Sequence, residues 1–467
     1  MSRLLPTAPL RRLAWSGVAA TAVVAVGGSL AGGAGESWTG WWTAPGVPVR
    51  PLVGVIPALA LFYGGMILVC RCWSRLRAEV AEGAVEWTSV VVIFVLWSVP
   101  LVLAPPLASR DVYAYAASGE VAAAGFDPYE VGPNVLGADA PVVAVVDPQW
   151  RDSPSPYGPL FVGVAAAVAR ASSGVAVSVL LLRVLALAGL LLATWGLRRL
   201  AGPDREAQAL AFLLCNPLVL LHLVSGAHNE ALMIGLLVAG LAIGTRRPAL
   251  GVVVCALAGG IKAPALLGVA YLGWTGAPGA AGWPRRALSV AGSGALAVGT
   301  LAVAGAVSGL GWGWLSTVSG STDVGAYLSP TTILGAALGP LFGPGALGIA
   351  QAVGVLVAVA ATVVLLLHSH RTGLVSLGTA LVIVALLGPV VQPWYLAWGA
   401  AVIAAAASPE RVRFLVAVSV GLCFAVLPAG PDLGRLAIEE PVAIGVALVA
   451  LMPLALVGVP RPGWLRP

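Results

Sequence analysis

The sequence predicts an all-α polytopic membrane protein, because it is apolar overall and its apolar residues fall in long runs. Of the 467 residues, 59% are hydrophobic and only 9% are charged, and the mean hydropathy is +0.96. A soluble domain carries about 25% charged residues. Runs of 18 or more apolar residues recur, each long enough to cross roughly 30 Å of hydrocarbon. We therefore expect about 14 transmembrane helices in one membrane domain over residues 1–467.

Clusters of arginine order these helices, since short cytoplasmic loops are enriched in Lys and Arg. If the apolar runs cross the membrane alternately between these clusters, both chain ends lie in the cytoplasm. Two short runs, 249–261 and 263–274, are predicted to form a thin hairpin with Lys262 near its outer end. The other expected spans are 13–33, 52–70, 87–107, 174–197, 207–225, 229–245, 286–309, 345–367, 373–391, 394–407, 412–430 and 441–459.

Two loops are predicted on the external face. Residues 108–157 contain seven acidic residues but only two arginines, Arg110 and Arg151. The Pro and Gly content of this segment indicates an ordered loop with short juxtamembrane helices, followed by a run that half-inserts from outside at 157–169. The second loop, 310–331, has no Lys or Arg.

The charge and cysteine patterns exclude several classes of function. The net charge of +6 comes from arginines in short loops that orient spans, so no nucleic-acid partner is expected. The five cysteines lie in or beside apolar runs without metal-site spacing to histidine, which indicates inert buried thiols. No cofactor or metal site is expected, although carboxylates could hold a hard divalent cation.

Four polar clusters fall on the external face of this topology. A charged group at a span costs several kcal/mol unless it is paired or wetted, so each cluster is a candidate functional site. The topology follows from the loop arginines alone and does not depend on these polar residues. Their placement on one face is therefore stronger evidence for a site than any single motif. The clusters are Asp111; His228, Asn229 and Glu230; Lys262; and Gln392 with Trp394 and Tyr395.

Each cluster also has a structural interpretation. Asp111 could form a surface ion pair with Arg110, and Asn229 could cap the following helix. Lys262 could extend its amine to the headgroups. Trp394 and Tyr395 could be ordinary interfacial aromatics.

Together, however, the clusters suit the chemistry of glycosyl transfer. A carboxylate at a water-accessible mouth can accept a proton from an attacking hydroxyl. A nearby lysine or histidine can neutralise a leaving phosphate. Aromatic rings can stack on a sugar while amides bond its hydroxyls. The set indicates transfer from a lipid-phosphate-sugar at the outer leaflet.

Six motifs resemble one known family in matching order. They are SRDVYAYAASGE, FDPYEVGP, SPYGPL, AHNEALMIG, GGIKAPALL and QPWYLAW, spread from about Asp111 to Trp398. They resemble the actinobacterial polyprenyl-phosphomannose-dependent α-1,6-mannosyltransferases, membrane glycosyltransferases of the GT-C class. The resemblance implies a GT-C-like bundle that transfers mannose from polyprenyl-phosphate-mannose to the α-1,6-mannan of lipomannan and lipoarabinomannan.

The resemblance also implies roles for individual residues in an inverting reaction. Asp111 falls at the acidic position of the first external loop and would be the catalytic base. The donor phosphate or its sugar would be bound by Arg110, His228, Asn229 and Lys262. The acceptor or sugar would be bound by Tyr113, Tyr157, Glu230, Gln392, Trp394 and Tyr395. The enzyme would lie in the plasma membrane with its active site facing outside, in contact with membrane lipids.

Two other classes of protein would share part of this pattern. Another lipid-phosphate-sugar-dependent enzyme of the same class, an arabinosyl- or protein-mannosyltransferase, would share Asp111 and the topology but differ in its acceptor groove. A transporter would place carboxylates in mid-span and show paired broken helices in two halves. The polar residues gather on one face instead, which favours the enzyme.

Overall fold

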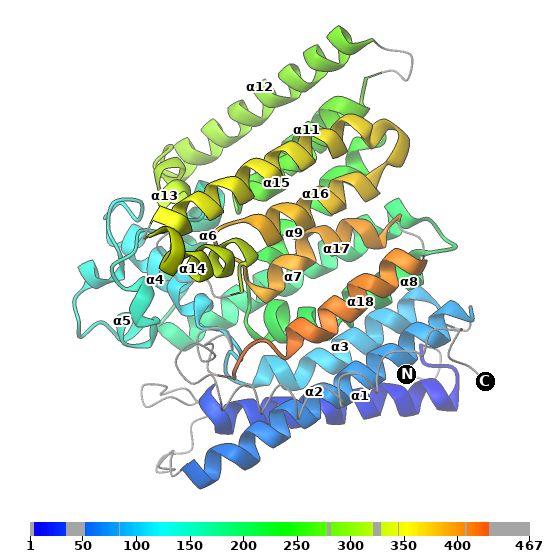
Figure 1. Cartoon of the computed structure of the whole chain (residues 1–467). Coiled ribbons are helices and arrows are strands. Elements are labelled where there is room, and N and C mark those ends of the chain that lie inside the picture. Colours follow the sequence, from blue (N-terminus) through cyan, green and yellow to red (C-terminus); the bar gives the residue numbers. More distant parts are fainter. Residues whose placement is uncertain are drawn as a thin grey trace. The chain divides into compact units, whose positions relative to one another are not determined.

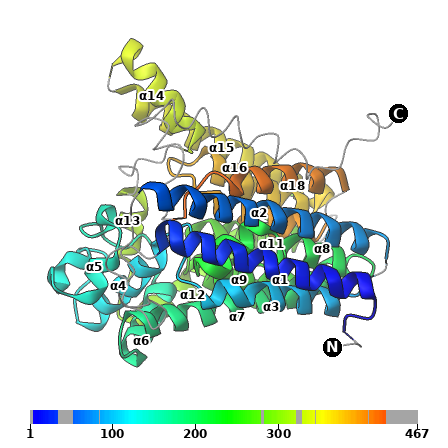
Figure 2. The same cartoon turned by 90° about the horizontal axis from the view of Figure 1, so that it is seen from below.

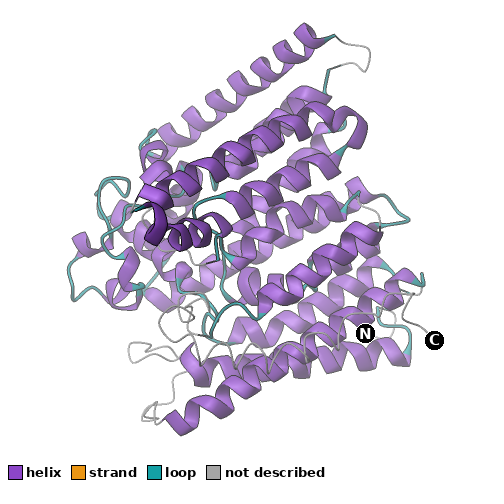
Figure 3. Ribbon diagram, in the orientation of Figure 1, coloured by secondary structure: helices purple, strands orange, loops and turns teal. Residues whose placement is uncertain are grey.

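The computed structural model describes residues 4–33, 52–83, 85–277, 282–320, 328–343, 345–406 and 409–428. Every regular element in these ranges is a helix, and they contain no β-strand (Figure 3). The predicted all-α class is confirmed for this part of the chain. The chain forms two compact units. One comprises residues 1–109, 207–225 and 408–467, and the other 110–206 and 226–407.

The first unit is built on α1 (Ala8–Gly28), α2 (Leu52–Ala81) and α3 (Trp87–Leu103), which lie side by side in Figures 1 and 2. Trp97 of α3 packs over Gly17 of α1, where a Cβ atom would collide with the indole ring. The same indole donates from Nε1 to the carbonyl oxygen of Ala14 at 3.0 Å. A π-helical turn, η1 (Ser29–Gly33), follows α1, and α18 (Pro409–Cys423) belongs to the same unit.

The predicted continuous span over 207–225 is wrong. Helix α8 (Glu206–Leu213) ends four residues before Pro217, and a π-helical segment, η4, resumes at Val219–Ser225. Proline has no backbone N–H, and its ring clashes with the carbonyl four residues earlier, so a helix cannot pass through this position undisturbed.

The second unit contains several long helices and a group of short ones. The short elements lie at one end of the unit (cyan in Figure 1) and are α4 (Asp111–Ala123), η2 (Pro133–Leu136), α5 (Pro141–Val145), η3 (Pro148–Trp150) and α6 (Pro159–Ala171). The remaining elements are α7 (Val175–Ala201), α9 (Glu230–Gly244), α10 (Pro248–Gly259), η5 (Ala263–Leu266), α11 (Leu267–Thr275), α12 (Trp283–Ser308), α13 (Trp314–Gly320), α14 (Pro330–Phe342), α15 (Gly345–Thr372), α16 (Leu374–Leu387), η7 (Pro393–Tyr395) and α17 (Leu396–Ala404).

Five helices in the described ranges are long and apolar enough to cross a membrane, and a sixth span is possible if η4 and α9 are counted together. They lie in α1, α2, α7, α12 and α15, while the other apolar helices are shorter. The chain is therefore membrane-associated, and the predicted number of about 14 spans stays a prediction. The expected span 441–459 and residues 321–327 of the second external loop lie outside the described residues.

Candidate active site

Helix α4 places the first two side chains of the site. Asp111 is its first residue, where a carboxylate interacts favourably with the positive end of the helix dipole. Tyr115 follows four residues later and so lies on the same face. The α4 helix approaches α6 closely, since a Cβ on Gly119 would lie 2.3 Å from the carbonyl oxygen of Ala165.

The first residue of α9 and the segment before that helix place the next three. Ala227 has a φ of 52°, a left-handed conformation that costs a non-glycine residue roughly 1–2 kcal/mol. Such local strain often marks functional sites. His228 and Glu230 are fully buried. Asn229 stands at the N-cap position, but its side chain forms no capping bond, so it does not act as the expected helix cap.

Lys262 is held by a close approach between two backbone segments. Gly158 N–H donates to the Ile261 carbonyl at 3.2 Å, and Leu160 N–H donates to the Gly260 carbonyl at 3.1 Å. A Cβ on Gly158 would lie 2.4 Å from the Gly260 oxygen, so only glycine allows this approach. The pairing sets Tyr157 beside the turn that carries Lys262.

Aromatic rings from the turn at η7 complete the site. The rings of His228 and Trp394 lie with centroids 3.9 Å apart. Tyr395 and Trp398 stack with centroids 4.2 Å apart. The Lys262 ammonium lies 4.2 Å from the Tyr395 ring and 5.3 Å from the Trp398 ring, within cation–π range.

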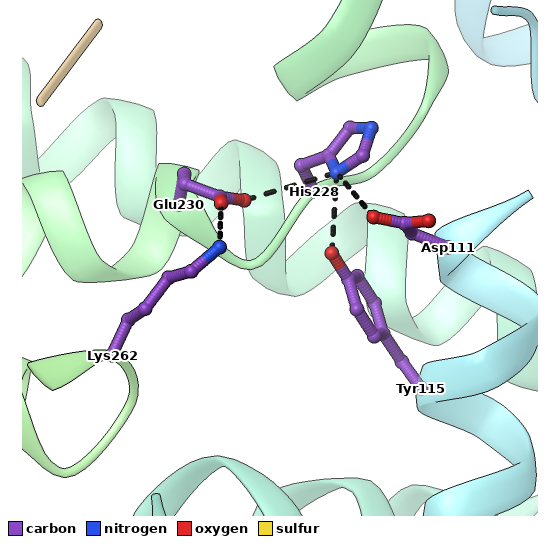
Figure 4. A network of polar contacts seen from close by, with 5 residues as sticks. All are labelled: Asp111, Tyr115, His228, Glu230 and Lys262. Carbon is purple, nitrogen blue, oxygen red and sulfur yellow. Dashed lines mark hydrogen bonds and ion pairs between the residues drawn. The ribbon is translucent and has the colours of Figure 1, made fainter. Parts of the chain in front are cut away.

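Figure 4 shows the resulting network of five side chains, which come from α4, the start of α9 with the segment before it, and the Lys262 turn. His228 Nδ1 lies 3.2 Å from the Tyr115 hydroxyl, 3.6 Å from Asp111 Oδ2 and 3.8 Å from Glu230 Oε2. Lys262 donates to Glu230 Oε1. The Asp111 side chain is 23% exposed, whereas those of His228 and Glu230 are fully buried. Asp111 therefore offers the carboxylate of this network that a substrate can reach.

Seven predicted site residues lie outside the network drawn in Figure 4. Four of them are described above: Tyr157, Asn229, Trp394 and Tyr395. The other three are Arg110, Tyr113 and Gln392. Arg110 precedes α4, is partly exposed, and forms no ion pair with any residue in the described ranges. Tyr113 is buried and interacts electrostatically with Arg183 of α7. Gln392 is partly exposed, and its backbone carbonyl oxygen accepts a hydrogen bond from Tyr395 N–H at 3.0 Å.

Two members of the site were not predicted from the sequence. Tyr115 contacts His228, and its position four residues after Asp111 on a helix was the available signal. Trp398 contacts Lys262, and it lies three residues after Tyr395 at the start of α17.

The expectation that the site uses no metal stays a prediction. No group of three His, Cys, Asp or Glu side chains in the part of the chain that the structure describes has the arrangement of a metal site. In the candidate site, the positive charge beside Glu230 is the Lys262 ammonium.

The site therefore combines buried charges with aromatic rings inside a helical, membrane-associated protein. Two family models match the chain. The α-(1→6)-mannopyranosyltransferase N-terminal domain matches residues 14–278, and the MptB C-terminal domain matches residues 321–456. The chain belongs to the α-(1→6)-mannopyranosyltransferase family and is a glycosyltransferase.

Actinobacterial relatives agree with this assignment. The chain is 35% identical to a probable α-(1→6)-mannopyranosyltransferase of Mycolicibacterium smegmatis, covering 76% of this chain and 72% of the relative. It is 31% identical to α-(1→6)-mannopyranosyltransferase A of Mycobacterium tuberculosis, over 78% and 74%. It is 33% identical to α-(1→6)-mannopyranosyltransferase B of Corynebacterium glutamicum, over 72% and 62%. No solved structure matches the chain significantly.

Proposed function

We propose that the enzyme transfers mannose from polyprenyl-phosphate-mannose to an α-1,6-mannan acceptor of lipomannan or lipoarabinomannan. The reaction would take place at the outer face of the plasma membrane and invert the anomeric centre. The observation that carries this proposal is the Asp111 carboxylate, which stays accessible at the edge of a network whose other carboxylate is buried.

In the proposed reaction Asp111 acts as general base. An acceptor hydroxyl oxygen attacks the anomeric carbon, its proton passes to Asp111, and the bond from that carbon to the phosphate oxygen breaks. Polyprenyl phosphate leaves with the electron pair, so a β-linked donor yields an α-linked product without a covalent intermediate. Glu230 is less suited to this role because it is fully buried beside the Lys262 ammonium.

The donor phosphate would be bound by the cations Lys262 and Arg110. Asn229 would bind the sugar, since it is buried and neither amide atom has a hydrogen-bond partner within the described structure. Leaving a buried polar group unsatisfied costs about 1–3 kcal/mol, and sugar hydroxyls would recover that cost. The sugar or the acceptor would be contacted by Tyr157, Tyr395, Trp394 and Gln392.

The test is an assay of membranes with radiolabelled polyprenyl-phosphomannose and short α-1,6-mannosides, with and without a chelator. We expect transfer by the wild type to give an α-linked product and to survive chelation. Asp111→Asn should lower the rate roughly 100- to 10,000-fold, the usual contribution of a general base.

Asp139→Asn provides the matched control, because Asp139 is an exposed carboxylate in the same loop, and its activity should be unchanged. A wild-type rate in Asp111→Asn would remove Asp111 as the base. Failure of the wild type to use this donor, while using another lipid-phosphate-sugar, would overturn the donor assignment.

A further inference from the structure

We propose that His228 is a positioning residue that holds the Asp111 carboxylate ionised and aimed through a proton on Nδ1. This inference rests on the proposed function, since it assumes that Asp111 is the base. It gives His228 a role in place of direct contact with the donor, because its Nδ1 already faces three oxygens of the protein.

Three oxygens from different parts of the site converge on one nitrogen of this ring (Figure 4). Tyr115 on α4 lies at hydrogen-bond distance, 3.2 Å. The Asp111 and Glu230 carboxylates, at 3.6 and 3.8 Å, lie just beyond it. Catalytic hydrogen bonds are often long before substrate binds and shorten in the complex.

This arrangement determines which nitrogen carries the proton. A bare lone pair on Nδ1 would face two carboxylates and be repelled by both. A proton there makes all three contacts attractive, because the phenol oxygen and both carboxylates accept. The neutral ring is therefore the Nδ1–H tautomer, an assignment that follows from the surrounding groups.

The ring is also prevented from turning away. Trp394 covers it, with ring centroids 3.9 Å apart. Ala227, in the left-handed conformation, sets the direction of the chain immediately before it. A donor fixed in this way needs no reorganisation when charge changes on Asp111.

Loss of the Nδ1 donor should change the pH dependence of the reaction. The titratable groups around Asp111 are Tyr115 on its own helix, and His228, Glu230, Lys262, Tyr157 and Tyr395 from other elements. Without the donor, the ionised form of Asp111 loses a stabilising partner and is no longer separated from Glu230. Since the base acts only when ionised, the acidic limb of the pH–rate profile should move to higher pH.

The experiment compares His228→Asn with His228→Gln. The asparagine amide places an N–H near the position of Nδ1, whereas the longer glutamine amide places it near Nε2. We expect His228→Gln to lose roughly 100-fold in kcat with little change in the donor KM, and its acidic limb to rise by about one pH unit. His228→Asn should keep kcat within about tenfold of wild type and leave the limb in place.

His368→Asn is the control, because His368 is exposed on α15 and its Nδ1 contacts only its own helix, at Val364 O. Its kcat, its donor KM and the acidic limb of its pH–rate profile should match those of the wild type. Equal losses in the Asn and Gln variants with an unmoved acidic limb would overturn the proposal and leave His228 as a packing residue. Activity in Asp111→Asn would instead refute the proposed base, which is a separate result.

Tyr115→Phe keeps the proposal testable if the His228 variants fail to fold. Phenylalanine preserves the edge-to-face packing on Tyr157 and Phe161 and removes only the hydroxyl near Nδ1. Only the carboxylates then share the fixed Nδ1–H, without a competing phenol oxygen, so the acidic limb should move to lower pH. An acidic limb that stays at the same pH, or moves to higher pH, would contradict the proposed role of His228.

Discussion

Lys262 is the only lysine in the sequence, and its ammonium is largely buried, where an unpaired charge would be energetically costly. Its side chain is 15% exposed and donates to Glu230, which is fully buried. The rings of Tyr395 and Trp398 also lie within cation–π distance. A buried ion pair adds little net stability over an apolar pair of the same shape, whereas removing one partner strands the other charge.

Single substitutions at this pair should therefore be far more harmful than the double substitution. Lys262→Met or Glu230→Gln should each lower the free energy of unfolding by about 3–5 kcal/mol, because each leaves a buried charge without its partner. The double variant should recover most of that loss. Thermal unfolding of the four proteins in the same detergent measures this, and additive losses would contradict a coupled pair.

At the residue scale, sequence reasoning found the charged members of the site but not their exact neighbours. Asp111, His228, Glu230 and Lys262 stood out because polar groups beside apolar spans are costly, and all four meet in one network. Tyr113, two positions after Asp111, lies on another face of the helix, and its predicted role in the site stays a prediction. Tyr115, four positions after Asp111, lies on the same face and contacts His228.

At the element scale, small residues allow α7 and α9 to pack closely. A Cβ on Gly235 would lie 2.3 Å from the carbonyl oxygen of Gly189, and a Cβ on Gly189 would lie 2.5 Å from that of Ala231. Gly196 makes a similar approach to Ala239. Close backbone contact at small residues is a common basis of helix association in membranes. Because α9 carries Glu230 at its start, this packing also holds the site.

Gly235→Ala should separate these helices and lower both stability and activity. The added methyl meets backbone atoms that cannot rotate away, so we expect a loss of about 1–3 kcal/mol. Gly299→Ala on α12 is the matched control, since nothing lies within 4 Å of its Cβ position. It should be neutral or slightly stabilising. Unfolding midpoints and transfer rates of both variants measure the effect, and equal behaviour would argue against tight α7–α9 packing.

Longer-range pairings explain why other elements could not be derived from the sequence. The hydroxyl of Ser329 at the start of α14 donates to the Gly388 carbonyl at 2.9 Å, and that of Thr332 donates to the Pro389 carbonyl at 3.1 Å. These bonds satisfy carbonyls left free where α16 ends. The partners lie almost sixty residues apart, and no local pattern indicates such a pairing. The helical class followed from the long apolar runs, whereas partners of this kind depend on tertiary contacts.

At the scale of the whole molecule, the charge pattern predicts the direction of insertion. The segment 108–157 is acidic, whereas Arg371 stands with His368 and His370 at the end of α15. Basic residues stay in the cytoplasm, so Arg371 should be inside and the acidic segment outside. The proposed function needs this orientation, because Asp111 begins the helix α4 in that segment.

Labelling of single cysteines on intact cells tests the orientation. The five native cysteines are buried, so the wild type should give little background. Asp139 and Arg371 are both exposed, which makes Asp139→Cys and Arg371→Cys a matched pair. A membrane-impermeant maleimide should label Asp139→Cys on intact cells and Arg371→Cys only after permeabilisation, because charged reagents do not cross the hydrocarbon core. The reverse pattern would place Asp111 on the cytoplasmic side and exclude an outer-leaflet donor.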